Sequence, residues 1–120
     1  MNRPPFGLHL PCEIVRVLDG DTVEVVLPGS TRGLRVRLLD CWCAERYTDE
    51  GKIATDRMKH FVEMTSGATS LFIPAPESTV HILGEILTFG RILAHIFVGP
   101  TDTLSELMVD SNHALKEKPK

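Results

Sequence analysis

The chain has 120 residues, of which 42% are hydrophobic and 24% charged, and its formal net charge at pH 7 is −3. This composition is that of an ordinary globular domain and excludes a disordered chain. The negative charge argues against a broadly basic nucleic-acid binder. We therefore predict one domain over residues 1–120, with a core at about 12–114 and a flexible N-terminal arm (1–11) and C-terminal tail (115–120).

No segment approaches the roughly 20 apolar residues of a membrane span, and the first residues contain no apolar run of signal-peptide length. We expect no membrane partner and an intracellular location. Three cysteines (Cys12, Cys41 and Cys43) favour a reduced compartment. Cys-x-Cys can bind a thiophilic metal, but without a second ligand pair it is better interpreted as two small core residues.

The first half of the chain predicts a β-meander. Two β-rich runs, Glu13–Leu18 and Thr22–Leu27, flank the turn Asp19-Gly20-Asp21, which is a strong hairpin signal. A third strand, "LRVRLLDC" (residues 34–41), alternates apolar residues with arginines, so that its two faces differ.

The hydrophobic period then changes from two residues to that of a helix. From Thr48, a plausible N-cap, to about residue 66 the apolar residues form a helical stripe. Two further strands follow, the second of them a long run that turns near Phe89-Gly90. A short last helix begins after Asp102 or Thr103 and ends near Asn112. The first of these strands is residues 69–75, and the long run is residues 79–87 and 91–99.

The element order βββ, α, ββ, α predicts a β-rich α+β fold, a small Greek-key barrel with helices packed outside. The histidines add little to it. We interpret His60, His81 and His95 as half-buried surface residues rather than ligands.

Several residues have the chemistry that phosphodiester cleavage requires. The planar guanidinium of an arginine binds two phosphate oxygens at once, and a glutamate accepts a proton from water. The carboxylates of Asp19 and Asp21 could hold a hard divalent cation. Each feature alone is ordinary, because Asp-Gly-Asp is most often only a turn and a strand arginine is usually solvated.

Taken together, four motifs resemble the staphylococcal-nuclease-like (thermonuclease) family, from about Val15 to Ala114. They are "V-x-D-G-D-T-V-x-V", "R-V-R-L-L-x-x-x-x-x-E", "F-G-R-I-L-A-x-I-F" and "L-x-E-L-M-V-x-x-x-H-A". The resemblance implies a five-stranded OB-type barrel with about three helices. It also implies a calcium-dependent enzyme that cleaves DNA and RNA.

The family's functional residues transfer to positions of this chain. Arg37 matches the arginine that grips the phosphate, and Glu45 matches the candidate general base. Arg91 matches the arginine that stabilises the transition state. Asp21 matches the direct metal ligand, with Asp19 beside it in the acidic turn.

One position departs from the family, since Trp42 stands where a second metal carboxylate is usual. Three interpretations follow. The first is a nuclease with an altered site for Ca²⁺ or another divalent cation. The second is a catalytically impaired OB-fold module that binds DNA, RNA or a protein, with Trp42 and Tyr47 stacking on bases. The third is that Trp42 merely fills the space of the ion.

Overall fold

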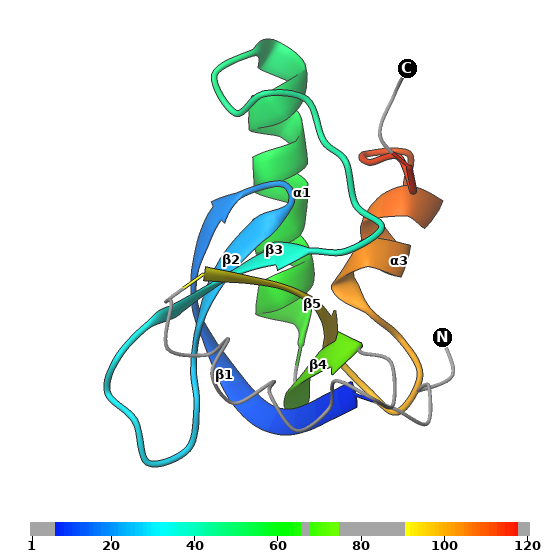
Figure 1. Ribbon diagram of the computed structural model, residues 1–120. Helices are drawn as coiled ribbons and strands as arrows, with labels where there is room; N and C mark the ends of the chain where they lie inside the picture. Colours follow the sequence, from blue (N-terminus) through cyan, green and yellow to red (C-terminus); the bar gives the residue numbers. More distant parts are fainter. Residues whose placement is uncertain (1–6, 66–67, 75–90, 118–120) are drawn as a thin grey trace.

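The computed structural model describes residues 7–65, 68–74 and 91–117, in which five strands form a closed barrel and two helices pack against it (Figure 1). The strand order is β1-β2-β3-β5-β4. This barrel is consistent with the predicted OB-type, β-rich fold, although two helices rather than three lie in the described residues. The elements are β1 (Gly7–Asp19), β2 (Thr22–Val26), β3 (Leu34–Leu38), α1 (Asp49–Met64), β4 (Thr69–Pro74), β5 (Arg91–Phe97) and α3 (Leu104–Asp110).

Strand β1 closes the barrel by pairing with two neighbours. Its first half pairs with β4 and its second half with β2, both antiparallel, and its pairing with β2 has two shifts of register. Such shifts bend a strand, which closure requires. We expected this strand from Glu13 and a flexible arm before it; instead it begins at Gly7, because Leu8 and Leu10 pack against the core.

The core lies inside the barrel and follows the two-residue period of the strands. On β3, Leu34, Val36 and Leu38 are buried, whereas Arg35 is exposed and Arg37 is half-buried. The other strands contribute further buried side chains, namely Val23, Val25, Leu71, Ile73, Ile92, Ala94 and Ile96. The predicted alternation of β3 is therefore confirmed over Leu34–Leu38.

Strand β3 is shorter than expected, since it ends at Leu38 rather than at residue 41. The chain turns at Leu39 and Asp40, and Asp40 takes a left-handed conformation (φ 55°) that no strand can continue. Before this turn, β3 pairs in parallel with β5, so that Arg35 lies opposite Arg91 and Arg37 lies opposite Leu93.

Helix α1 begins as the sequence predicts. The Thr48 hydroxyl accepts a hydrogen bond from the Gly51 N–H (3.0 Å), which satisfies one free amide of the first turn. Gly51, Ala54 and Met58 recur at helical spacing and are buried, so one face of α1 covers the barrel. The helix ends at Met64; residue 66, near which we expected it to end, lies outside the described residues.

Helix α3 begins after Thr103, not Asp102. The Thr103 hydroxyl accepts from the Glu106 N–H, and Glu106 accepts from the Thr103 N–H, which forms a capping box. Asn112 follows the helix with a φ of 63°, as predicted for its stop.

His95 is buried (5% exposed), so our interpretation of it as a half-buried surface residue is wrong. The start of α3 covers this part of β5, and Thr103 and Ser105 line one pocket with His95. Burial lowers the pKa of His95, although the neighbouring carboxylates of Asp40 and Glu106 oppose that shift.

His60 is exposed, whereas His81 and the expected strand 79–87 lie outside the described residues. Within residues 7–65, 68–74 and 91–117, no helix has the length and apolar content needed to traverse a membrane.

Candidate functional site at the barrel rim

The turn between β1 and β2 carries two carboxylates. The Asp19 carboxylate accepts a hydrogen bond from the Asp21 N–H (3.0 Å), and the Thr22 hydroxyl donates to Asp21 Oδ1 (3.1 Å). Glycine is required between the aspartates, because a Cβ at Gly20 would lie 2.8 Å from the Ala54 Cβ of α1. These contacts direct Asp21, whose side chain is 14% exposed, toward the end of β3.

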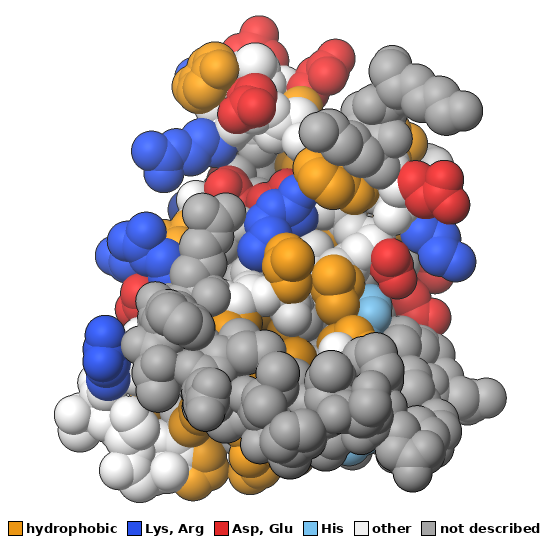
Figure 2. All heavy atoms as spheres, in the orientation of Figure 1, with side chains coloured by type: hydrophobic (Ala, Val, Ile, Leu, Met, Phe, Trp, Pro, Cys, Tyr) orange, Lys and Arg blue, Asp and Glu red, His pale blue; other side chains and the backbone are white. Residues whose placement is uncertain are grey.

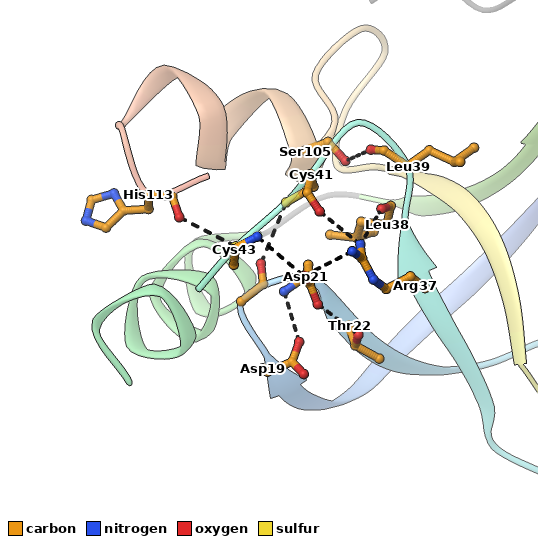
Figure 3. A network of polar contacts seen from close by, with 11 residues as sticks. Asp19, Asp21, Thr22, Arg37, Leu38, Leu39, Cys41, Cys43, Ser105 and His113 are labelled. Carbon is orange, nitrogen blue, oxygen red and sulfur yellow. Dashed lines mark hydrogen bonds and ion pairs between the residues drawn. The ribbon is translucent and has the colours of Figure 1, made fainter. Parts of the chain in front are cut away.

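The guanidinium of Arg37 is held by the chain that follows it. Its Nη1 donates to the carbonyls of Leu38 (3.0 Å) and Cys41 (2.9 Å), and its Nη2 lies 3.4 Å from Asp21 Oδ2 (Figure 3). The Cys41 carbonyl reaches it because the chain reverses at Asp40. Both protons of Nη1 are therefore used and Nη2 faces Asp21, so Nε and the second proton of Nη2 are the donors left for an anion.

Asp21 is the less well stabilised half of this pair. Burial, the hydrogen bond with Asp19 and the charge of Asp19 raise the pKa of Asp21 to about 6, while Arg37 and Thr22 oppose the rise. The nearby guanidinium thus only partly offsets the loss of water. A carboxyl that titrates near neutral pH beside an arginine is typical of functional sites, although structural pairs also produce such shifts.

Trp42 lies over the guanidinium at the rim of the barrel, not in the core. The Arg37 Cζ is 4.6 Å from the centre of the Trp42 ring, within the range of a cation–π contact. The backbone of Trp42 pairs in both directions with that of Leu115 (2.8 and 2.9 Å), which fixes the residue. The ring nevertheless remains 36% exposed, so it is accessible to a ligand.

Cys41 and Cys43 flank Trp42 and pack around the acidic turn. The Cys41 thiol donates to the Gly20 carbonyl (3.8 Å), and the Cys43 thiol donates to the His113 carbonyl (3.5 Å). The pKa of Cys41 is raised by its hydrogen bond with the Cys43 side chain and by burial. All three cysteines are free thiols, and these two act as small packing residues.

The described residues do not form a metal-binding group. No three His, Cys, Asp or Glu side chains in residues 7–65, 68–74 and 91–117 are placed to hold one ion. Ca²⁺ takes six to eight oxygen ligands. Here the Asp19 carboxylate already accepts the Asp21 N–H. The described residues at this rim therefore offer a hard cation few oxygen ligands.

Glu45 lies in the exposed loop between Trp42 and α1. Its carbonyl accepts from the Thr48 N–H (3.0 Å) and hydroxyl (2.7 Å), which ties the loop to the N-cap of the helix. Its side chain lines a pocket of about 490 Å³ together with Trp42, Cys43 and His113. Glu45 and Arg37, both of them described, form no ion pair or hydrogen bond with each other.

The remaining predicted residues lie around this centre. Arg91 is the first residue of β5, where its backbone is in register with Arg35; the structure describes nothing of its side chain. Tyr47 is 74% exposed and lines a different pocket from Trp42, so the two rings do not form one platform in this structure. The structure thus brings together Asp19, Asp21, Arg37 and Trp42.

Sequence reasoning missed the main-chain partners of this centre. The carbonyls of Leu38 and Cys41 orient Arg37, and the Cys43 N–H lies 3.5 Å from Asp21 Oδ2. Main-chain groups leave no residue-specific signal. The bridge from Trp42 to Leu115 was also missed, because Leu115 lies in the segment that we expected to be a flexible tail.

Two bacterial proteins are similar in sequence to this chain. One from Escherichia coli is named an uncharacterized endonuclease and is 30% identical over 101 residues; one of the same name from Escherichia coli O157:H7 is 29% identical over 101 residues. Each match covers 84% of this chain but 57% of the relative, so the chain spans little more than half the length of these proteins. No protein-family model matches the chain.

Proposed function

We propose that the chain is a nuclease of the staphylococcal-nuclease-like family, which hydrolyses phosphodiester bonds in DNA or RNA. The observation that carries the proposal is the fixed guanidinium of Arg37 beside Asp21 at the rim of a closed barrel. A phosphate site needs such a preorganised cation. The endonuclease names of the two relatives agree with the same class of substrate.

In this proposal Arg37 binds the reacting phosphate. Its Nε–Nη2 edge offers two parallel N–H donors to two phosphate oxygens and neutralises the charge that develops on them. Glu45, in the pocket that Trp42 lines, accepts the proton of the attacking water. Arg91 supplies a second cation, an assignment supported by the pairing of β3 with β5.

A divalent cation, Ca²⁺ by resemblance, is the proposed cofactor, with Asp21 as its ligand and Asp19 beside it. When bound, such an ion adds positive charge at the phosphate. Because the described residues offer few carboxylates, we expect weak binding of hard cations.

A cleavage assay tests the proposal. Purified protein is incubated with single-stranded DNA and with RNA, in Ca²⁺ and in Mn²⁺. We expect Arg37→Ala to lower the cleavage rate about 100-fold or more, the cost of removing one donor to a developing charge. Arg35→Ala is the matched control, since it removes the same charge from the exposed face of the same strand. Equal rates for wild type and Arg37→Ala would contradict the proposal.

The second candidate is an impaired nuclease that binds nucleic acid or a protein without cleaving it. It is favoured by the ring of Trp42, which covers the guanidinium where a metal carboxylate is expected. Calorimetric titration of Ca²⁺ into wild type, Trp42→Asp and Trp42→Asn separates the candidates. Tight Ca²⁺ binding by Trp42→Asp alone, together with binding of nucleic acid without product, would favour this second candidate.

A further inference from the structure

A second pocket, of about 400 Å³, lies beside the rim site and shares no residue with the pocket of Glu45. The loop before α1 contributes to both, with Glu45 in one and Arg46 and Tyr47 in the other. Leu18, which directly precedes Asp19, also lines the second pocket. The pocket therefore begins next to the acidic turn and runs along α1. We call it the α1 groove, lined by Leu18, Arg46, Tyr47, Lys52, Thr55, Asp56 and Lys59.

The α1 groove is basic although the whole chain carries a net charge of −3. Arg46, Lys52 and Lys59 contribute three positive charges against one carboxylate, that of Asp56. All three basic side chains are exposed, and none forms an ion pair with a described residue. Basic side chains are also unevenly spread over the face seen in Figure 2, where most of them lie on the left and the acidic ones on the top and right.

The spacing of the lysines suits an extended polyanion. Lys52 and Lys59 are seven residues apart on α1, two turns of helix, so they lie on one side of it about 10 Å apart. The buried residues Ala54 and Met58 lie on the side that packs on the barrel. The lysines therefore form a short row parallel to the helix axis rather than a single point charge.

Tyr47 adds an aromatic surface at the edge of the groove. Its side chain is 74% exposed, and no described ring packs against it. An exposed ring beside a row of cations is the arrangement with which proteins bind single strands, because the cations follow the phosphates and the ring stacks on a base. In a duplex the bases are already stacked, so this arrangement favours a single strand.

We infer that the α1 groove binds the single-stranded nucleic acid that flanks the phosphate at Arg37. Arg46, Lys52 and Lys59 contact its phosphates, and Tyr47 stacks on one of its bases. This inference rests on the proposed function only in its placement of the strand beside Arg37. It explains how an acidic protein holds a polyanion without a large basic surface.

Fluorescence anisotropy with a labelled single-stranded oligonucleotide tests the groove. The double variant Lys52→Gln/Lys59→Gln removes two charges from it, and Arg32→Gln/Lys116→Gln removes two exposed charges that do not line it. We expect the groove variant to bind about tenfold or more weakly than the control variant. Its plot of log K against log salt should be shallower by about 1.4, since each phosphate contact contributes about 0.7 for a single strand.

Tyr47→Ala is a third arm, because it removes the ring without removing a charge. It should weaken binding while leaving the salt slope unchanged, as expected for a lost stacking contact. Equal affinity and slope for the groove and control variants would overturn the inference. Tighter binding of a duplex than of a single strand would also overturn it.

A cleavage assay tests the proposed nuclease activity separately from binding in the groove. The control variant Arg32→Gln/Lys116→Gln should cleave single-stranded DNA at the wild-type rate, whereas Arg37→Ala should lose cleavage. Salt-dependent binding through the groove without cleavage by wild type would sustain the groove and remove the nuclease. Cleavage by wild type, together with undiminished binding by the groove variant, would sustain the nuclease and remove the groove.

Discussion

At the scale of the residue, the two members of the Asp21–Arg37 ion pair differ in how their surroundings affect their charges. Arg37 has two carbonyl acceptors and the face of Trp42, whereas Asp21 has a raised pKa despite the guanidinium 3.4 Å away. At Asp21, burial and the neighbouring Asp19 thus outweigh the contacts with Arg37 and Thr22. That asymmetry fits a site that binds a phosphate with the arginine and uses the carboxylate for another partner.

The raised pKa predicts how stability depends on pH. In the unfolded chain Asp21 loses its proton near 3.8, the ordinary pKa of an aspartate, whereas in the folded protein it keeps the proton to about pH 6. Between these values the folded state holds more protons than the unfolded state, so the free energy of unfolding falls as pH rises through this window. The free energy of unfolding falls by about 3 kcal/mol at most across this window, since one pKa unit corresponds to about 1.4 kcal/mol.

Asp21→Asn removes this titration and should therefore stabilise the protein more at about pH 8 than at about pH 4. Urea unfolding at the two pH values measures the difference between variant and wild type. Asp110→Asn, at an exposed carboxyl of α3, is the control. A stabilisation by Asp21→Asn that is the same at both pH values would show that the carboxyl is not perturbed.

At the scale of the element, the loop between β3 and α1 is fixed at both ends. Trp42 pairs with Leu115 at one end, and the Glu45 carbonyl is tied to Thr48 at the other. The first turn of α1 presses against the loop, because a Cβ at Gly51 would lie 1.8 Å from the Glu45 carbonyl oxygen. Gly51 therefore sets the position of Glu45.

Gly51→Ala should displace this loop. Alanine is the better helix former by about 1 kcal/mol, but the contact is with main-chain atoms, which do not yield. We expect a net loss of about 1–3 kcal/mol in the free energy of unfolding, measured with denaturant, and slower cleavage. Gly99→Ala is the control, since nothing lies within 4 Å of a Cβ there. Wild-type stability in Gly51→Ala would show that the loop is free to move.

The elements that the sequence predicts well are those set by local interactions. The hairpin at Asp19-Gly20-Asp21, the N-cap at Thr48 and the stop at Asn112 each depend on a few neighbouring residues. The features that it misses depend on residues distant in the chain. Strand β1 starts at Gly7 because β4 pairs with it, and His95 is buried because α3 covers β5.

The same distinction applies to the candidate site. Asp21, Arg37 and Trp42 were identified from the sequence and do lie together. The two carbonyls that orient Arg37 were not, because a carbonyl belongs to every residue and is placed only by the turn at Asp40. Local patterns thus identified the side chains, and the fold supplied their orientation.

At the scale of the whole molecule, closure of the barrel brings four segments of the chain to one rim. They are the β1–β2 turn, the end of β3, the loop before α1 and the chain after α3 (Figures 1 and 3). The rim therefore carries the Arg37 site, the Glu45 pocket and the start of the α1 groove. A strand held in the groove would have a phosphate near Arg37.

The central claim is that Arg37 binds a phosphate at this rim. Calorimetric titration of a nucleoside bisphosphate into wild type, Arg37→Gln and Arg35→Gln, with and without Ca²⁺, tests it without dependence on turnover. We expect Arg37→Gln to bind about tenfold or more weakly, the value of a hydrogen bond to a charged group, and Arg35→Gln to match wild type. Equal affinity of wild type and Arg37→Gln would contradict the claim.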